Sequence, residues 1–236
     1  MGVPAIDGGT FARPDLRGRV SVVTGAVTEL GGRGVAVRLD HRDDDEVRAF
    51  FEQVGVDEGR IDILVGNATG NDYHGDKTIR AMYSPVWMKP LGWWDANHGV
   101  GVRSNFVMCR YGLPHMVGRP SLVVLTSEPI THGPTHPDPV YDLRAHATHR
   151  MARTFGEQLK DQQVAMVCLV PGDVQTHSRR QGHEDEPIPA GGETVHLAGR
   201  AVASLAADPQ VLRHAGASLR VAECADAYGF TDAVDD

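Results

Sequence analysis

The chain has 236 residues, three cysteines and a formal net charge of −8 at neutral pH. This length suits a single domain with one buried core. The net charge is negative, and the Lys and Arg residues are scattered along the chain. This argues against nucleic acid as a partner, because nucleic-acid binding requires clustered Lys and Arg side chains that displace counterions. No apolar run approaches the roughly 20 residues that cross a bilayer, and no leader pattern opens the chain. We therefore expect a cytoplasmic protein whose partner is a small molecule, with no membrane or nucleic-acid contact.

The remaining composition predicts no metal site. Cys109, Cys168 and Cys224 show no metal-ligand spacing, and an odd number cannot pair completely, so buried thiols are expected. Two loop histidines, His132 and His136, have a helical ligand spacing, but the glycine and prolines around them disfavour a helix there.

Strand-like and helix-like segments alternate along the chain. Residues 1–16 are rich in Gly and Pro, which predicts a flexible arm ahead of one domain over 17–236. Short apolar or β-branched runs predict five strands, at 20–24, 35–39, 61–65, 122–126 and 164–170. Helical patterns begin near Asp43 and then cover 93–116, 141–159 and 194–205. This alternation predicts an α/β fold with a mostly parallel sheet covered on both faces.

Five motifs occur in a fixed order on these elements. They are GRVSVVTGA at 18–26, GRIDILVGNA at 59–68, VVLTS at 123–127 followed by Tyr141, PGDVQT at 171–176, and YGFTD at 228–232. In this order they resemble the short-chain dehydrogenase/reductase (SDR) family over nearly the whole chain from Arg17. The resemblance implies one Rossmann-like, doubly wound domain that associates as a homo-oligomer. It places Ser127 and Tyr141 in catalytic positions and the Pro171-Gly172 turn beside the nicotinamide.

The unit that binds the cofactor phosphates in the family is shortened here. There a Gly-rich turn and a helix hold the pyrophosphate, and a second strand reads the ribose. The segment from Gly25 to Gly34 is too short for a crossover to a parallel neighbour, which needs a dozen or more residues. The strands at 20–24 and 35–39 must then pair antiparallel, lie apart, or exchange between subunits. We interpret the chain as a divergent member, remodelled at its first βαβ unit and without the phosphate loop.

A second departure lies on the predicted catalytic helix. The family pattern is Tyr, three residues, then Lys, whereas this chain reads Tyr141-Asp142-Leu143-Arg144-Ala145. That lysine lowers the pKa of the tyrosine, whose ordinary value is near 10. Arg144, one helical turn from Tyr141, could return the positive charge, or could be a solvated surface arginine.

These departures favour a redox-neutral lyase, isomerase or cyclase of secondary metabolism that acts on a small carbonyl-bearing metabolite without nicotinamide. Ser127 and Tyr141 would polarise the carbonyl, Arg144 would supply charge, and His132 would move the proton. One alternative is an NADPH-dependent carbonyl reductase or dehydrogenase with an atypical phosphate site. Its cofactor would then contact Gly25, Gly31, Gly32, Asp40, Asn67, Pro171, Gly172 and Thr176. The other alternative is a non-catalytic protein that binds a ligand or a partner.

Overall fold

The computed structural model describes residues 15–23, 34–68, 76–130, 138–176 and 188–232. A five-stranded sheet lies at the centre, in the order β1-β2-β3-β4-β7, and every neighbouring pair is parallel. The strands are β1 (Ser21–Val23), β2 (Ile63–Gly66), β3 (Ser121–Thr126), β4 (Val164–Val170) and β7 (Ser218–Arg220). A two-stranded ribbon of β5 (Asp173–Val174) and β6 (Gly192–Glu193) extends from the end of β4. The predicted α/β fold with a parallel sheet is confirmed.

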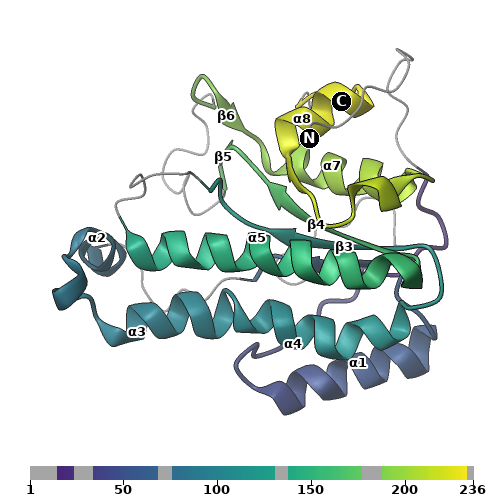
Figure 1. The fold of residues 1–236 in the computed structure, drawn as a ribbon, viewed down its shortest axis with the longest axis horizontal. Helices are drawn as coiled ribbons and strands as arrows, with labels where there is room; N and C mark the ends of the chain where they lie inside the picture. The colour runs from purple at the N-terminus through teal and green to yellow at the C-terminus, as the bar shows by residue number, and fades with distance from the viewer. Residues whose placement is uncertain (1–14, 24–33, 69–75, 131–137, 177–187, 233–236) are drawn as a thin grey trace.

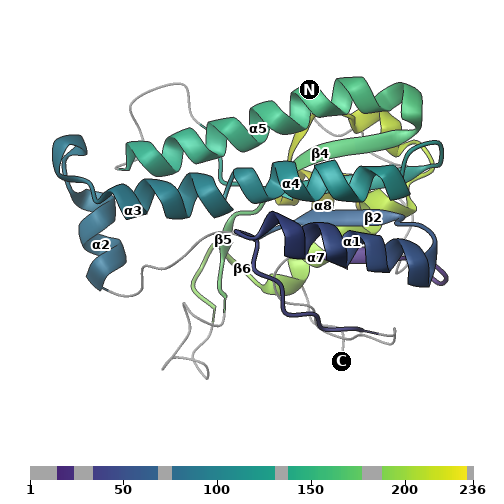
Figure 2. The same cartoon turned by 90° about the horizontal axis from the view of Figure 1, so that it is seen from below.

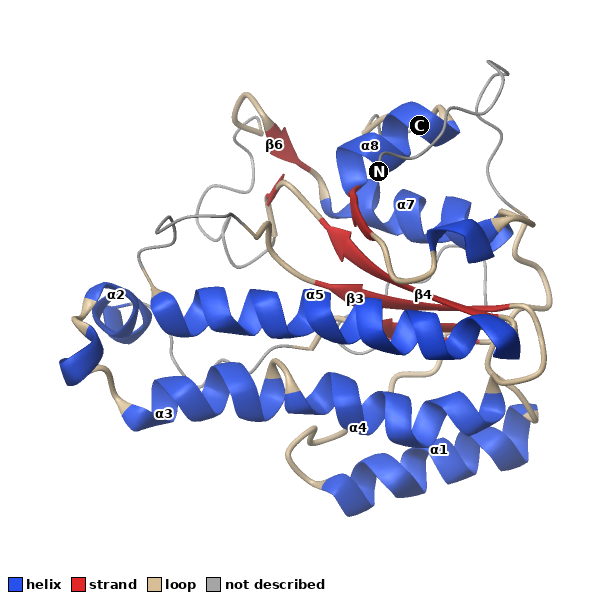
Figure 3. Cartoon of the chain, viewed as in Figure 1, coloured by secondary structure: helices blue, strands red, loops and turns tan. Residues whose placement is uncertain are grey.

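Helices cover both faces of the sheet, as the cartoons show (Figures 1 and 3). One layer holds α1 (Asp44–Glu58), α4 (Arg103–Gly112) and α5 (Pro139–Leu159), which run side by side in Figure 2. The other layer holds α7 (Val195–Ala207) and α8 (Val221–Tyr228). The elements α2 (Asp76–Tyr83), a 3-10 turn (Val86–Met88) and α3 (Leu91–Trp94) project beyond the sheet at the end where α5 begins. No described helix is long and apolar enough to cross a bilayer.

The apolar core forms two clusters because the strands bury side chains on both faces. Phe51, Met108 and Met166 lie in the cluster under α1, α4 and α5, and Leu169 and Leu205 lie in the one under α7 and α8. All of β4 is buried, as the continuous apolar run 164–170 predicts for a central parallel strand. The three cysteines are buried free thiols, as expected.

The strand predicted at 35–39 does not form. Residues 34–40 have no regular structure, and Val35 and Val37 are more than half exposed. β1 instead pairs directly with β2, in the register Val22 to Leu64. The chain between these two strands, including α1, is long enough for a parallel crossover. Because residues 34–40 form no strand, none of the three arrangements considered for strands at 20–24 and 35–39 occurs among the described residues.

The single long helix predicted over 93–116 is also broken. It divides into α3, a π-helical segment (Asp95–Val100), α4 and a 3-10 turn (Leu113–His115). Gly99 and Gly101 lie at the π segment and the turn that follows it. A π segment widens a helix locally and occurs frequently at functional sites.

Candidate functional site

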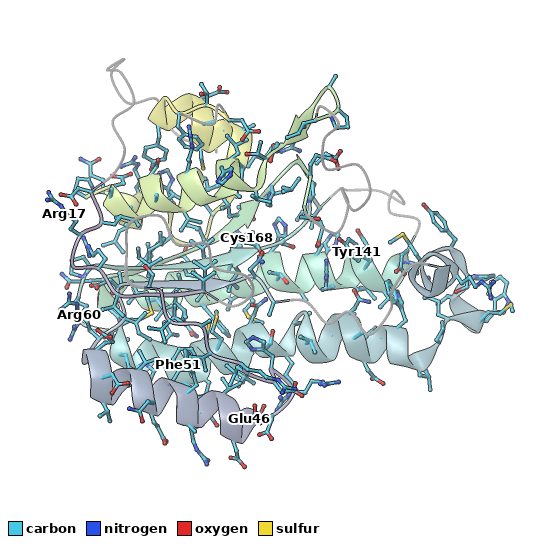
Figure 4. All side chains as sticks on the ribbon, turned by 180° about the vertical axis from the view of Figure 1, so that it is seen from behind. Arg17, Glu46, Phe51, Arg60, Tyr141 and Cys168 are labelled. Atoms are coloured by element: carbon cyan, nitrogen blue, oxygen red, sulfur yellow. The ribbon has the colours of Figure 1, made fainter. Side chains whose placement is uncertain are left out.

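The candidate site lies at the carboxyl edge of the sheet, where parallel α/β sheets bind their ligands. β2 ends just before Asn67, β3 just before Ser127 and β4 just before Pro171, so these three residues leave the same edge. Tyr141 enters this region from the first turn of α5. In Figure 4 Tyr141 lies far from Arg17 and Arg60, which mark the opposite end of the strands.

A glutamate joins the two functional groups of α5. The Tyr141 hydroxyl donates a hydrogen bond of 2.6 Å to Glu128 Oε1, and Arg144 Nη2 donates to the same oxygen. The Arg144 guanidinium also lies over the Tyr141 ring, 4.1 Å from its centroid, which is a cation–π geometry. Arg144 is therefore buried in this cluster and is not a solvated surface arginine.

The protonation of Tyr141 follows from this environment. Burial raises the pKa of the Tyr141 phenol, and the negative charge of Glu128 raises it further. Arg144 lowers the pKa, but its effect is smaller than the two that oppose it. Tyr141 is therefore a neutral phenol near pH 7, and it has a proton to give.

Arg144 reaches this position because Gly101 has no side chain. A Cβ placed on Gly101 would overlap the carbonyl oxygen of Asn97 and approach Arg144 Cδ to 2.7 Å. Ala145, at the position of the family's lysine, is buried. The Arg144 side chain therefore packs in a space that Gly101 leaves open, next to Tyr141.

The backbone of Ser127 is fixed by the sheet, and its side-chain hydroxyl takes no part in the sheet's hydrogen bonds. Its N–H donates to the Leu169 carbonyl at 3.0 Å, which continues the β3–β4 ladder. Its hydroxyl is buried and forms no hydrogen bond of ordinary geometry within the described residues. The Cys168 thiol next to it has a pKa that burial raises to about 12 and a hydrogen bond with Ser127 lowers by a smaller amount, so this thiol stays protonated near neutral pH. A buried polar atom of this kind is suited to bind a ligand oxygen.

The end of β2 is shaped by two asparagines. Thr126 Oγ1 donates to Asn67 Oδ1 at 2.7 Å, which holds the side chain that follows β2. A Cβ on Gly66 would overlap the side-chain oxygen of Asn105, so α4 occupies the space that a larger residue would need. This packing explains why the chain has Gly66 where the family motif has Asn.

A buried ion pair fixes the start of α5. Asp138 caps the helix by accepting from Val140 N at 3.0 Å, and it also accepts from Trp93 Nε1 at 2.5 Å. Lys89 Nζ lies 2.9 Å from Asp138 Oδ1, and both side chains are almost completely buried. Lys89 also donates to the carbonyls at the end of α2, Ala81 O and Met82 O. The first turn of α5, which carries Tyr141, is thereby tied to α2 and α3.

The turn after β4 lies on the same edge. Gly172 N donates to Glu193 Oε2 at 2.9 Å, and a Cβ on Gly172 would overlap that carboxylate. Thr176 follows β5 and donates its backbone N–H to Val174 O. Pro171, Gly172 and Thr176 therefore lie at the carboxyl edge of the sheet, and their contact with a nicotinamide stays a prediction.

The other predicted contacts are placed differently. Asp40 precedes α1, and its carboxylate accepts hydrogen bonds from Arg42, which lower the Asp40 pKa to about 2. It lines a polar surface depression with Asp44, Arg103 and Tyr111. Gly25, Gly31, Gly32 and His132 lie outside the described residues. No group of three or more potential metal ligands occurs among the residues that the structure does describe.

Sequence reasoning missed Glu128, Lys89 and Asp138. Glu128 is 13 residues from Tyr141 on a loop, and Lys89 is 49 residues from Asp138, so no local period links them. The available signal was Asp138-Pro139 ahead of a helical pattern, because Asp is a preferred N-cap and Pro a preferred first helical residue.

Comparisons with known proteins agree with this geometry. Residues 8–207 match the model of the family described as Enoyl-(Acyl carrier protein) reductase. The chain is 32% identical over 226 residues to human Dehydrogenase/reductase SDR family member 1, covering 89% of this chain and 71% of that protein. Its fold resembles a Sinorhizobium meliloti dehydrogenase/reductase (24% identity, TM-score 0.63, 80% of this chain and 73% of that one). It also resembles a Burkholderia cenocepacia short-chain dehydrogenase in complex with NADP (21% identity, TM-score 0.64, 80% and 76%).

These findings correct two expectations. The favoured redox-neutral lyase, isomerase or cyclase is contradicted, because the matching family model and the curated relatives are reductases and dehydrogenases. The expectation of no cofactor is contradicted as well, because the matching family model and the human relative are those of a reductase and a dehydrogenase/reductase. The physical error was to treat a shortened phosphate loop as a lost cofactor site, although the edge formed by β2, β3 and β4 is retained. With a family model over 200 residues and a human relative at 32% identity, the chain belongs to the short-chain dehydrogenase/reductase family.

Proposed function

We propose that the protein is an NAD(P)H-dependent carbonyl reductase with an atypical nucleotide site. The observation that carries this proposal is the partly buried, neutral Tyr141 hydroxyl, which enters the carboxyl edge of the sheet where Ser127 follows β3. The Tyr141 phenol carries a proton near pH 7, and donating it to a carbonyl oxygen is the proton transfer that reduction requires. The nicotinamide, when bound, supplies the hydride.

The residues present fit the nicotinamide half of the cofactor. Asn67, Pro171, Gly172 and Thr176 leave the sheet at this edge, and the Ser127 hydroxyl lies between the ends of β2 and β4. Ser127 would bind the substrate oxygen together with Tyr141. Arg144 supplies positive charge next to the phenol in place of the missing lysine.

The adenosine half would be held in an unusual way. The strand that reads the ribose in relatives has no counterpart among the described residues, since β1 is the edge of the sheet. We propose that the backbone around Gly25, Gly31 and Gly32 binds the phosphates and that Asp40 lies toward the adenine. A cofactor held mainly through its nicotinamide half should bind more weakly than in a relative with the complete unit.

Glu128 completes the proton path. It accepts from Tyr141, and its side chain is about one third exposed, so its carboxylate connects the phenol to solvent. After Tyr141 Oη gives its proton to the substrate oxygen, Glu128 can return one from water. The chain would thus replace the lysine-based relay of its family by a glutamate–arginine pair on the same tyrosine.

Titration of the purified protein with NADPH and NADH, followed by cofactor fluorescence and thermal shift, tests the cofactor. Binding in the micromolar range supports the proposal, and no binding at millimolar cofactor would overturn it. Oxidation of the reduced cofactor in the presence of a panel of aldehydes then measures turnover.

Tyr141→Phe tests the proton donor. We expect turnover to fall by about 10²- to 10⁴-fold, the usual contribution of general acid catalysis, with cofactor affinity unchanged. Tyr83→Phe, at an exposed tyrosine on α2, makes the same chemical change and should leave the rate as it is. Full activity in Tyr141→Phe would remove Tyr141 from the mechanism.

Three further expectations remain proposals. The domain would comprise residues 17–236, with 1–16 as an arm. Copies would associate as a homo-oligomer through the long helices, and the substrate would be a small metabolite of secondary metabolism.

A further inference from the structure

A second polar cluster is joined to the Tyr141 site through Glu128, whose backbone carbonyl lies 2.8 Å from His149 Nε2. A cavity of about 180 Å³ opens beside the carboxyl end of β4, with apolar walls from Pro129, Ile130 and Val170. His149 and Ser218 line it, together with the charged residues Arg220 and Glu223. His149 comes from α5, and Ser218 begins β7, which pairs with the end of β4. None of these side chains takes part in the carbonyl chemistry proposed above.

Hydrogen bonding fixes the tautomer of His149. Its Nε2 lies 2.8 Å from the backbone carbonyl oxygen of Glu128. A carbonyl only accepts, so Nε2 must carry a hydrogen. In the neutral ring Nδ1 is then a bare acceptor, and it lies 2.7 Å from Ser218 Oγ. The Ser218 hydroxyl therefore donates to His149, which leaves the oxygen lone pairs of Ser218 directed away from the base.

The environment keeps His149 in this neutral form. Burial lowers its pKa, with a smaller contribution from the positive charge of His146, and the Glu128 carbonyl and carboxylate oppose this shift. His149 is consequently a base at neutral pH. The Nε2–H bond to Glu128 O would also stabilise the imidazolium that forms when Nδ1 takes a proton, as the third member of a catalytic triad does.

We propose that Ser218, with His149 as its general base, is a nucleophilic site that hydrolyses small carboxylic esters. Ser218 Oγ attacks the ester carbonyl carbon, and its proton moves to His149 Nδ1. The bond to the alcohol oxygen breaks, and Nδ1 gives that oxygen its proton. Water then repeats the sequence and releases the acid, so the balance is ester plus water to acid plus alcohol.

The cavity limits the substrate. Its volume of about 180 Å³ accommodates an acyl group of a few carbon atoms against Pro129, Ile130 and Val170. Arg220 supplies positive charge for the oxyanion that develops on the carbonyl. Glu223 accepts from the Arg220 backbone N–H at 3.4 Å and balances this charge at the rim.

A fluorophosphonate probe tests the nucleophile on the full chain. Serine attack at phosphorus forms an Oγ–P bond and expels fluoride, so a reactive serine is labelled covalently and can be located by mass spectrometry. We expect one label per chain, on Ser218, and a burst of one p-nitrophenolate per chain from p-nitrophenyl acetate. An unlabelled wild-type chain, or a label on another serine, would overturn the proposal.

Variants separate this site from its surroundings. Ser218→Ala should abolish labelling, and its melting temperature should equal that of the wild type, which shows that the variant is folded. His149→Gln should slow labelling by at least 100-fold. Ser84→Ala is the matched control, because Ser84 Oγ donates to a backbone carbonyl, Ala81 O, and has no base. Tyr141→Phe should be labelled normally, so the outcome is independent of the reductase proposal. Equal labelling of Ser218→Ala and wild type would contradict the assignment.

Discussion

Two helices of the same layer, α1 and α5, begin with the same kind of cap in opposite environments. Asp43 accepts from Asp45 N and Glu46 N at an exposed end of α1, among other acidic residues. Asp138 accepts from Val140 N in complete burial, with Lys89 and Trp93 on its carboxylate. The α1 end follows residues 34–40, and the α5 end carries Tyr141. The end of α5 that carries Tyr141 is therefore held by buried pairs, whereas the start of α1 is held by exposed ones.

The largest expected difference concerns these two caps. Removing one member of a buried ion pair leaves an uncompensated charge and costs about 3–5 kcal/mol. Asp138→Ala or Lys89→Met should therefore lower the free energy of unfolding by this amount. Asp43→Ala removes only a solvated cap, which costs about 0.5–2 kcal/mol. Urea denaturation of the variants measures both values, and equal losses would show that burial of the α5 cap has no energetic consequence.

A smaller effect is expected at the glycine that makes room for Arg144. Gly101→Ala places a methyl group against Asn97 O and Arg144, and such overpacking costs about 1–3 kcal/mol. The displaced guanidinium should also raise the Tyr141 pKa further, because it lowers that pKa from its present position. Gly99→Ala is the control, since a Cβ there meets no atom within 4 Å. A Gly101→Ala variant as stable as Gly99→Ala would contradict the packing argument.

Sequence reasoning predicted the fold well where packing is local and continuous. The run 164–170 was predicted as a buried strand, and β4 has these bounds, because an unbroken apolar run is typical of a parallel strand that is buried on both faces. The run 35–39 has a similar local pattern but forms no strand, since no neighbouring strand is present to bond it. A strand depends on its neighbour in the sheet, and sequence periodicity does not report whether that neighbour exists.

The candidate site was predictable only in part. Motif order placed Tyr141 at the start of α5 and Ser127 after β3, where the structure has them, and Arg144 was proposed because it is one helical turn from Tyr141; their catalytic roles stay predictions. Glu128 was missed, since a loop carboxylate gives no periodic signal and its contact with α5 is made by tertiary folding. The inference that no cofactor binds was wrong for a related reason. It relied on the departure in one segment, 25–34, and not on the carboxyl edge of the sheet, which β2, β3 and β4 form from residues far apart in the sequence.

The smallest expected effect is a difference in pH dependence between the two regions. Burial lowers the pKa of His149 and His98, so the unfolded chain takes up their protons first as the pH falls below about 6.5. A lowered histidine pKa therefore costs nothing above this pH and removes stability below it. At the α1 end, Arg42 and Arg103 lower the pKa values of Asp40 and Asp44. Their contribution is present above the ordinary carboxyl value near 3.9 and is lost only below it.

Melting temperatures at pH 7.5, 5.5 and 4.5 would separate these contributions. The wild type should lose stability between pH 7.5 and 5.5, and His149→Gln should lose less over the same interval, because Gln takes up no proton. His146, Glu128 and, across the cavity, Arg220 and Glu223 are the charged or titratable groups near His149, and the charge of Glu128 opposes the loss. Arg42→Gln, which removes the partner of Asp40, should follow the wild type through both steps, because the Asp40 carboxyl stays ionised down to pH 4.5 with or without it. A melting temperature that is flat from pH 7.5 to 5.5 in the wild type would mean that the buried histidines of the α5 side do not remain neutral in the folded state. The base assigned to Ser218 would then already be protonated at pH 5.5.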